Sequence, residues 1–231
     1  MRILLWYWGR RGGGAQYTAC LAEALARRPD VRLALSVSDR MELLDGLRAL
    51  DAELDAELDA VPTFGGPVGA ALGTLGVARP ARRLVAQARR FRADLVFSAM
   101  SHVWTPLAAP FLGRAGIPFV AAVHDARPHP GDPGWLWDWR LARELNAARA
   151  AVAFSDPVVA ELRRRRPGLP VLQQTLGAHF PDAPGTALPV PVPGQFLFFG
   201  RVRAYKGLDL LAEAFRLLRG RHPEATLRVV G

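Results

Sequence analysis

Strand-like and helix-like segments alternate along this chain, and the alternation restricts the fold more than any other feature. Short apolar runs predict strands, and longer amphipathic stretches predict helices. The expected strands are residues 2–8, 31–37, 94–98, 117–123, 151–154 and 170–174. The expected helices are residues 15–28, 40–58, 79–92, 103–114, 136–149 and 156–166. This order is typical of a parallel sheet with helices on both faces, so we expect an α/β protein with a Rossmann-like sheet.

Residues 175–194 interrupt the alternation, because this segment contains five prolines and three glycines. Such composition is typical of a connection between domains. We therefore expect a first, Rossmann-like domain over residues 1–175, a linker over 176–193 and the beginning of a second domain over 194–231.

A four-residue repeat of acidic residues, alanine and leucine occupies residues 51–59. The spacing predicts that Leu50, Leu54 and Leu58 form one stripe of a helix, with the acidic side chains on its solvated face. The alternative interpretation is a pair of catalytic carboxylates. The repeat favours the solvated helix face.

Composition restricts the cellular setting and the partners. The chain has a single cysteine, Cys20, so an internal disulfide is excluded and a cytoplasmic protein is expected. The formal net charge of +9 favours an anionic partner, and contact with an anionic membrane is one option. Nucleic acid is not expected, because the signatures of common nucleic-acid-binding modules are missing from the sequence.

Lysine occurs once in the chain, at Lys206, although lysine and arginine together number 30. A compact ammonium is therefore expected to have a specific purpose at this position, and phosphate is the anion that it suits best. Arg201 lies five residues earlier and could add a forked pair of donors. Both residues follow an apolar run at 195–199 and precede the helical pattern of 208–218. The carboxyl end of a strand and the start of a helix form a favourable place for an anion.

This segment resembles the retaining glycosyltransferases of family 4, which have the two-domain GT-B fold. The shared motif comprises Gly200-Arg201, Lys206-Gly207 and a helix, followed by a strand that ends at Gly231. The resemblance implies the first βαβ unit of a GT-B second domain, with Arg201 and Lys206 binding the donor diphosphate. It also implies that this second domain is incomplete here, so the chain alone is expected to be inactive.

The activity that the resemblance implies is transfer of a sugar, of the hexosyl type, from a nucleoside diphosphate donor to a hydroxyl acceptor with retention. The donor is a substrate, and no cofactor or metal is expected. The acceptor could be a sugar, a lipid-linked molecule or a small molecule. Two other classes stay open. They are a nucleotide-binding Rossmann module without transfer activity, and an interaction protein that self-associates through its incomplete domain.

The turn after the first expected strand is rich in glycine, over residues 9–14. A dinucleotide fingerprint counted from Gly12 would need glycine or alanine at position 17, where the chain has Tyr17, so an NAD site is not expected. The resemblance implies that Gly13 and Gly14 let the backbone approach the donor phosphates. The alternative is a turn that needs a positive φ.

His124 and Asp125 follow the strand expected at 117–123. The carboxyl ends of parallel strands face ligands in such sheets. With the family resemblance, this placement predicts His124 as a catalytic residue and Asp125 as a contact to the acceptor or sugar. A metal site formed by His124, Asp125 and His129 is the weaker alternative, because no zinc-binding spacing is satisfied.

Three tryptophans, Trp135, Trp137 and Trp139, occupy alternate positions of an expected helix. Residues two apart cannot all share one helix face. Some of these side chains are therefore expected at the surface, where they could contact a sugar, a lipid or the second domain.

Overall fold

The computed structural model describes residues 1–54, 57–131, 133–177, 190–200 and 202–231. The chain divides into two compact units, and each is described here by itself. The first consists of Met1–Pro128 and Asp132–Pro181, and the second of His129–Gly131 and Asp182–Gly231. Most of the linker predicted at 176–193 lies outside the described residues.

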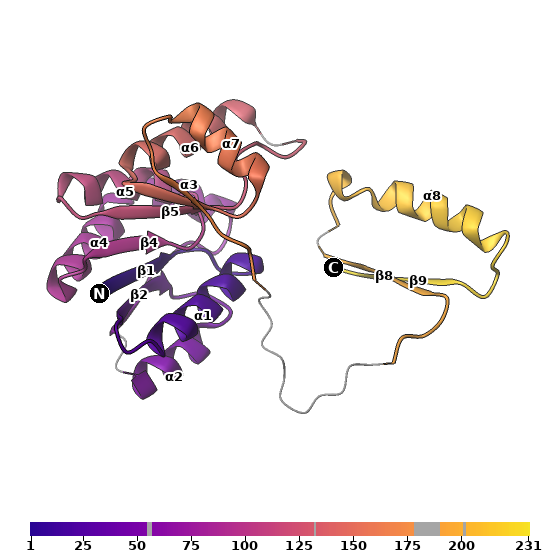
Figure 1. Ribbon diagram of the computed structural model, residues 1–231, viewed down its shortest axis with the longest axis horizontal. Helices are drawn as coiled ribbons and strands as arrows, with labels where there is room; N and C mark the ends of the chain where they lie inside the picture. The colour runs from indigo at the N-terminus through magenta and orange to yellow at the C-terminus, as the bar shows by residue number, and fades with distance from the viewer. Residues whose placement is uncertain (55–56, 132, 178–189, 201) are drawn as a thin grey trace. The chain divides into compact units, whose positions relative to one another are not determined.

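The first unit is built on a seven-stranded parallel sheet with the order β3-β2-β1-β4-β5-β6-β7 (Figure 1). Its strands are β1 (Arg2–Tyr7), β2 (Arg32–Ser38), β3 (Glu57–Val61), β4 (Leu95–Ser98), β5 (Phe119–Val123), β6 (Ala150–Ala153) and β7 (Val171–Gln173). The chain winds outward from β1 to β3, crosses back to β4 and then winds to β7. The direction reverses between β1 and β4, which is where open α/β sheets bind ligands.

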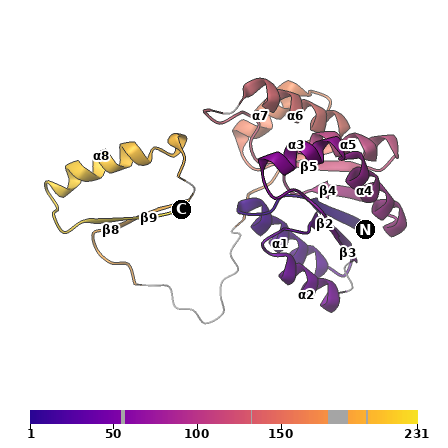
Figure 2. The ribbon, with the colours of Figure 1, turned by 180° about the vertical axis from the view of Figure 1, so that it is seen from behind.

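Helices cover both faces of this sheet, as expected (Figures 1 and 2). They are α1 (Gly13–Ala26), α2 (Leu44–Leu54), α3 (Pro67–Leu75), α4 (Ala78–Phe91), α5 (Thr105–Arg114), α6 (Gly134–Ala147) and α7 (Asp156–Arg165). One apolar core packs α1 and α2 against the sheet, and a second packs α4 to α7 against the opposite face. The doubly covered parallel sheet confirms the α/β fold class.

The first strand is buried because both neighbours are paired with it and both faces are covered. Leu4 and Leu5 point to opposite faces and are fully buried. Trp6 and Trp8 lie on the same face as Leu4, and their rings meet edge to face at 5.0 Å. The indole N–H of Trp8 donates to the Ser36 hydroxyl at 3.2 Å, so this buried polar group is satisfied.

The helix predicted over 40–58 is wrong at its end. Helix α2 ends at Leu54, and Glu57 begins an edge strand, β3, in which Leu58 pairs with Leu35 of β2. The leucine stripe therefore does not continue along one helix. Sheet pairing outweighs the helical repeat here, because β3 gains a hydrogen-bonded neighbour. Residues 55–56 of the repeat lie outside the described part of the chain.

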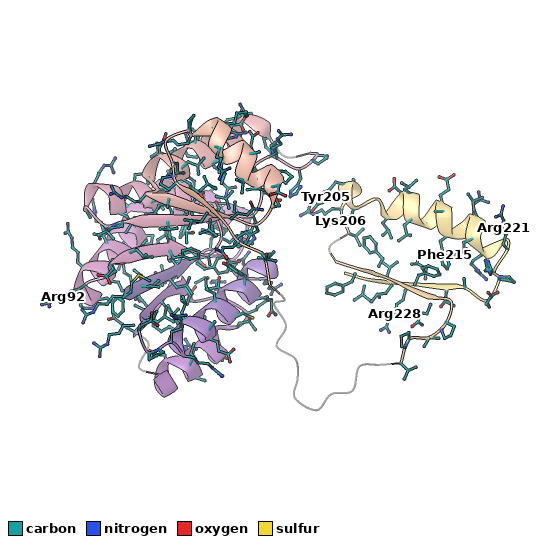
Figure 3. All side chains as sticks on the ribbon, viewed as in Figure 1. Arg92, Tyr205, Lys206, Phe215, Arg221 and Arg228 are labelled. Carbon is teal, nitrogen blue, oxygen red and sulfur yellow. The ribbon has the colours of Figure 1, made fainter. Side chains whose placement is uncertain are left out.

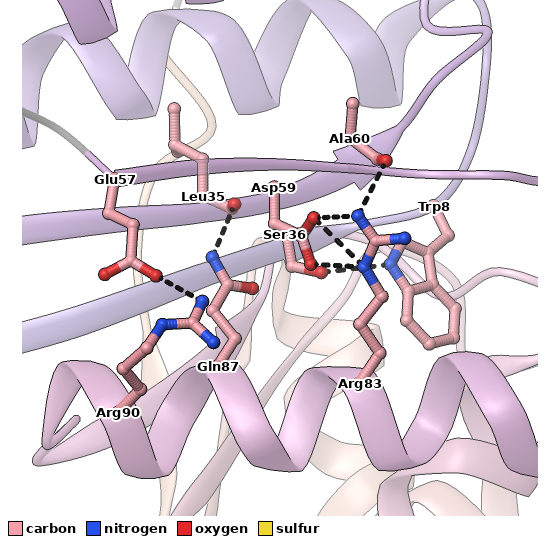
Figure 4. Close-up of polar contacts among 9 residues, drawn as sticks. All are labelled: Trp8, Leu35, Ser36, Glu57, Asp59, Ala60, Arg83, Gln87 and Arg90. Atoms are coloured by element: carbon pink, nitrogen blue, oxygen red, sulfur yellow. Dashed lines mark hydrogen bonds and ion pairs between the residues drawn. The ribbon is translucent and has the colours of Figure 1, made fainter.

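The acidic residues of β3 form ion pairs with α4 and do not line a solvated helix face (Figure 4). The Arg90 guanidinium donates to Glu57 at 2.7 Å, and Arg83 forms a forked pair with Asp59. Each carboxylate thus has a cationic partner from the neighbouring layer. The contacts fasten the edge strand to α4 and explain why this acidic run is compatible with a strand.

Helix α3 is a second element that the sequence did not predict. Its sequence is short and rich in small residues, so it has little amphipathic pattern. The helix packs on Trp104, whose indole N–H donates to the Thr74 hydroxyl at 3.1 Å. A Cβ atom on Gly73 would lie 2.6 Å from the Trp104 ring, so this approach requires glycine.

The second unit contains two paired parallel strands, β8 (Gln195–Phe199) and β9 (Thr226–Val230). Helix α8 (Leu208–Arg219) connects them in sequence and lies beside them (Figures 1 and 3). A short 3-10 helix, Ala204–Lys206, precedes α8. The rings of Phe196 and Phe215 join strand and helix edge to face, with centroids 5.7 Å apart. The order of elements confirms the predicted βαβ unit.

No helix among the described residues is both long and apolar enough to span a bilayer.

Candidate functional site

His124 directly follows β5 and is held by contacts from three other parts of the first unit. Its Nε2 lies 3.0 Å from the carbonyl oxygen of Ala99, which follows β4. Its ring meets Tyr17 of α1 edge to face at 5.4 Å and Phe154, after β6, at 4.5 Å. The imidazole therefore has a fixed orientation at the carboxyl edge of the sheet, where the sequence predicted it.

A cavity of about 280 Å³ lies beside His124, at the ends of β4 and β5. His124 and Asp125 both line it, so the structure brings these two predicted residues to one hollow. The opposite wall comes from α6. The cavity is lined by Met100, Ser101, Ala122, Val123, His124, Asp125, Trp137, Arg140, Leu141 and Glu144.

Glu144 is a polar group of this cavity that the sequence did not reveal. It lies on α6, is 3% exposed and accepts a short hydrogen bond from the Ser101 hydroxyl. Burial raises the pKa of the Glu144 carboxyl to about 7, although the Ser101 hydrogen bond and the positive charge of Arg140 act to lower it. The site thus contains a carboxyl group that holds its proton more strongly than an exposed glutamate does. The sequence carried no signal for it, because Glu144 resembles any other charged residue of an amphipathic helix.

Arg140 lies one helical turn before Glu144 and also lines the cavity. One guanidinium nitrogen is 3.4 Å from the Ser101 hydroxyl, which in turn donates to Glu144. Ser101 therefore connects the guanidinium to the buried carboxyl. Within the described residues, the buried Nε of Arg140 has no hydrogen-bond acceptor.

His102 is a half-buried histidine near this site, and its surroundings keep it neutral. Its ring stacks on Phe64 at 5.3 Å, and its Nδ1 accepts from the Trp104 amide at 3.3 Å. Burial lowers the pKa of His102 to about 3, and the positive charges of Arg140 and Arg10 add to this effect. His102 accordingly acts as an uncharged member of the packing.

The glycines of the glycine-rich turn differ in backbone conformation and in the space around them. Gly12 has a φ of 78°, and its amide donates to a carboxylate oxygen of Glu42 at 2.8 Å. Gly13 begins α1 and has open space where a side chain would be. A Cβ on Gly14 would lie 2.6 Å from the Tyr7 hydroxyl and 2.7 Å from the Met100 sulfur. A side chain at Gly14 would thus have to displace Tyr7 or Met100, a residue of the cavity wall, and the positive φ belongs to Gly12.

Lys206 closes the 3-10 helix of the second unit, and Gly207, with a φ of 67°, separates it from α8. Its ammonium nitrogen lies 5.3 Å from the centre of the Tyr205 ring (Figure 3). The side chain is exposed at the turn that leads into the helix. Arg201, its predicted partner, lies outside the described residues.

The three tryptophans of α6 differ in exposure, as the alternate spacing predicted. Trp135 is 75% exposed and Trp139 is 41% exposed, while Trp137 is half-buried and lines the cavity. The guanidinium of Arg143 lies 5.4 Å from the Trp139 ring centre. One of the three indoles therefore belongs to the candidate site, and the other two reach the surface.

Two solved structures with related folds are distant from this chain in sequence. Anabaena HepE in complex with UDP and glucose matches the whole chain and 61% of its own length, with a TM-score of 0.65 and 16% identity. Neisseria meningitidis UDP-GlcNAc 2-epimerase bound to UDP-GlcNAc matches 75% of this chain and 45% of its own, with a TM-score of 0.54 and 13% identity. These likenesses confirm the GT-B type of fold. They do not decide the activity, because one fold can carry many different functions.

Sequence comparison is more specific. A GDP-mannose:glycolipid 4-beta-D-mannosyltransferase of Xanthomonas campestris pv. campestris is 31% identical over 125 residues, which are 52% of this chain and 32% of that enzyme. The aligned part thus spans about a third of the length of this curated relative. The sequence model of Glycosyltransferase Family 4 matches residues 11–170, which include β2 to β6 and the entire cavity wall. The chain therefore belongs to Glycosyltransferase Family 4.

Proposed function

We propose that the protein containing this chain transfers a hexosyl unit from a nucleoside diphosphate sugar to a hydroxyl group of an acceptor. The acceptor oxygen forms a bond to the anomeric carbon, and the bond from that carbon to the diphosphate breaks. The hydroxyl proton leaves, and the diphosphate departs with the bonding electrons. The observation that carries the proposal is the family match over 11–170, which spans the cavity at the ends of β4 and β5.

Lys206 and Arg201 are proposed to bind the donor diphosphate, with Gly13 and Gly14 as backbone contacts. Lys206 precedes the N-terminus of α8, and Gly13 begins α1. Both helix starts expose amides that favour anions. HepE was solved with UDP, and the Xanthomonas relative is named for GDP-mannose, so a nucleoside diphosphate is the ligand class supported here. The ammonium would neutralise charge that develops on the leaving diphosphate.

His124 is proposed to contact the transferred sugar and to assist cleavage of its bond to the diphosphate. Asp125 is proposed as a further contact to the acceptor or sugar. The support is the fixed orientation of the imidazole beside the cavity that Asp125 also lines. A catalytic group contributes more when it is held in the reacting geometry.

The decisive experiment incubates the complete protein with radiolabelled GDP-mannose or UDP-glucose and with glycolipid or oligosaccharide acceptors. We expect transfer from one donor, unaffected by EDTA because no metal is expected to be required. His124→Ala should lower kcat by about 10²-fold, as for loss of a positioned catalytic group. Donor hydrolysis or epimerisation without transfer would contradict the proposal and favour a nucleotide-binding module of another activity.

We also propose retention at the anomeric carbon, as the resemblance implies. The Xanthomonas relative is named for a β-linkage, so the product anomer is an informative measurement. Proton NMR of the product, compared with the donor, distinguishes the two outcomes. A product with the opposite configuration would show inversion and remove this part of the proposal.

The polypeptide of residues 1–231 is expected to self-associate. The basis is the second unit, in which Phe196, Leu197 and Phe199 of one short strand are 46%, 65% and 74% exposed. Exposed apolar strands favour pairing with another copy. Light scattering at increasing concentration tests the association, and a monomer at all concentrations would contradict it.

Peripheral contact with an anionic membrane is a further proposal, supported by Trp135, Trp139 and the neighbouring Arg143 on α6. Indoles and cationic side chains are favoured at membrane surfaces. Sedimentation with phosphatidylglycerol vesicles, compared between the unchanged chain and a Trp135→Ser/Trp139→Ser variant, should show loss of binding in the variant. Equal sedimentation would contradict a role for these indoles.

A further inference from the structure

Three rings from separate parts of the first unit meet at the carboxyl edge of its sheet and form an aromatic cluster. Tyr17 lies on α1, His124 follows β5, and Phe154 follows β6. The ring centroids are 5.4 Å apart for Tyr17 and His124, 4.5 Å for His124 and Phe154, and 5.5 Å for Tyr17 and Phe154. Each ring therefore contacts the other two. Such a closed set of contacts restricts rotation of the imidazole more than a single neighbour would.

The hydrogen bond of His124 decides which ring nitrogen carries the proton of the neutral imidazole. Nε2 lies 3.0 Å from the carbonyl oxygen of Ala99, and a carbonyl oxygen can only accept. Nε2 therefore donates, and Nδ1 is the nitrogen that can accept a hydrogen bond. The position of the Ala99 carbonyl is itself fixed, because the Ala99 amide donates to the carbonyl oxygen of Trp6 in β1 at 3.1 Å.

Phe154 is a large side chain at the end of a strand of small residues. The strand before it, β6, consists of three alanines and a valine. Phe154 is half-buried, and neither of the two apolar cores formed by the described residues includes it. Among those residues, its ring contacts are with Tyr17 and His124. The packing of Phe154 is therefore explained by the aromatic cluster and not by the core.

Tyr17 joins the aromatic cluster to the packed part of α1. It lies one turn after Gly13, at the start of the helix, and packs against the core that α1 and α2 form with the sheet. Burial raises the pKa of the Tyr17 phenol, so its ring stays uncharged at neutral pH. An uncharged ring on a packed helix is a rigid support for the imidazole.

We propose that Tyr17 and Phe154 are positioning residues, which hold the His124 imidazole with its Nε2 proton on the Ala99 carbonyl. In this orientation the neutral ring can accept a hydrogen bond or a proton at Nδ1. It cannot give the Nε2 proton to a substrate without breaking its bond to Ala99. The effect on sugar transfer rests on the proposed function, whereas the ring orientation is a property of the chain itself.

NMR of the histidine ring nitrogens tests the orientation in the 231-residue chain without any substrate. The nitrogen shifts distinguish the two neutral tautomers, and His124→Gln assigns the signals of His124. We expect the Nε2–H tautomer alone, with an N–H signal that exchanges slowly because the carbonyl holds the proton. A mixture of tautomers, or the Nδ1–H tautomer, in the unchanged chain would overturn the proposal.

Single substitutions test the two positioning residues. Phe154→Leu and Tyr17→Leu each remove one ring, and each should speed exchange of the His124 Nε2–H by about tenfold, because a ring pair that opposes rotation is lost. Tyr17→Phe keeps the ring and should preserve the rate of the unchanged chain. Phe91→Leu is the matched control, since Phe91 is also half-buried but ends α4 and lies outside the aromatic cluster.

If Tyr17→Leu fails to fold, Phe154→Leu decides alone, because Phe154 lies outside both apolar cores of the described residues. Exchange as slow in the folded variants as in the unchanged chain would overturn the assignment. An equal acceleration by Phe91→Leu would overturn it as well.

Kinetics of the complete protein test what the positioning contributes. Phe154→Leu should lower kcat by about tenfold with KM for the donor unchanged, because His124 is less often in the reacting geometry. An unchanged kcat, or a rise in KM alone, would overturn the positioning role. If the exchange results hold but no donor supports transfer, the proposed function fails while the assigned ring orientation stands.

Discussion

The two units of this chain use the same local pattern and reach very different degrees of burial. Strand β1 and strand β8 are both apolar in sequence, yet five of the six residues of β1 are buried and none of the five in β8 is. In the first unit, both faces of the sheet carry helices and β1 has a neighbour on each side. In the second, one described α-helix accompanies two strands, and Ala225 is the one buried residue among those described. Burial is therefore a property of the assembled layers and not of the segment.

The largest expected effect is a core truncation in the first unit. Trp8→Ala should lower the free energy of unfolding by about 3 to 5 kcal/mol, because it removes a fully buried ring and leaves the Ser36 hydroxyl without its donor. All six tryptophans lie in the first unit, so tryptophan fluorescence in urea reports on that unit alone. Phe196→Ala, in the second unit, is the comparison. It should leave this fluorescence midpoint unchanged, and a shared shift would show that the two units unfold together.

The next largest expected effect on stability comes from protonation of Glu144, which also lies in the first unit. The Glu144 carboxyl has a pKa of 4.5 in the unfolded chain and about 7 in the folded one. This difference corresponds to a change of roughly 3 kcal/mol in the free energy of unfolding. Between these pH values the folded chain holds the additional proton, so its stability falls as pH rises from about 4.5 to 7. Glu144→Gln should therefore become more stable relative to the unchanged chain over that range. Urea denaturation below and above this range measures the difference, and parallel curves would contradict it.

His102 should act in the opposite direction. The unfolded histidine binds a proton below about pH 6.5, whereas the folded one does so only near pH 3. Stability that depends on neutral His102 is accordingly lost as pH falls below 6.5. His102→Asn removes this contribution. The stability of each variant relative to the unchanged chain is plotted against pH, and the curves for His102→Asn and Glu144→Gln should have slopes of opposite sign.

Nucleotide binding gives the main expected effect in the second unit. In the complete protein, Lys206→Ala should weaken binding of UDP or GDP by about 1.5 to 3 kcal/mol, because one charge-assisted contact is lost. Arg203→Ala is the matched control, since Arg203 is also exposed and lies three residues away. Isothermal titration measures both. Equal losses would remove the reason for assigning Lys206 to the diphosphate.

The smallest expected effect concerns β3, which is intermediate in burial between β1 and β8. Asp59→Asn breaks the pair with Arg83, whose side chain is 49% exposed, and should cost no more than about 1 kcal/mol. Asp45→Asn, in a pair where Asp45 is 95% exposed, should cost less still. Thermal unfolding in low and high salt compares the two variants. A larger loss in Asp45→Asn would contradict this order.

The sequence predicted most of the sheet because six of its strands in the first unit are short apolar runs separated by amphipathic helices. It failed where local pattern and tertiary contact disagree. The leucine repeat favoured one long helix, but Leu58 has a partner in Leu35 only if the chain is extended. Helix α3 was not predicted because it is stabilised by packing against Trp104. This residue is 30 positions away in sequence from Thr74, its hydrogen-bond partner in the helix.

The sequence predicted His124 and Asp125 of the candidate site but not Glu144 and Ser101. His124 and Asp125 follow an apolar run, and a position at the carboxyl end of a parallel strand lies on the ligand side of the sheet whatever the rest of the fold. Glu144 and Ser101 are 43 residues apart, and only the packing of α6 beside the end of β4 joins them. The raised pKa of Glu144 is likewise a consequence of burial, which no spacing in the sequence records.

The position of β1 has a consequence for how the chain folds during synthesis. Strand β1 is made before β4 at residues 95–98, yet it pairs with β4 as well as with β2. Until β4 emerges from the ribosome, one edge of β1 and the indoles of Trp6 and Trp8 have no permanent cover. Pairings between distant segments form slowly and expose aggregation-prone surface meanwhile. The stage before β4 is made is therefore the one at which a chaperone would matter most.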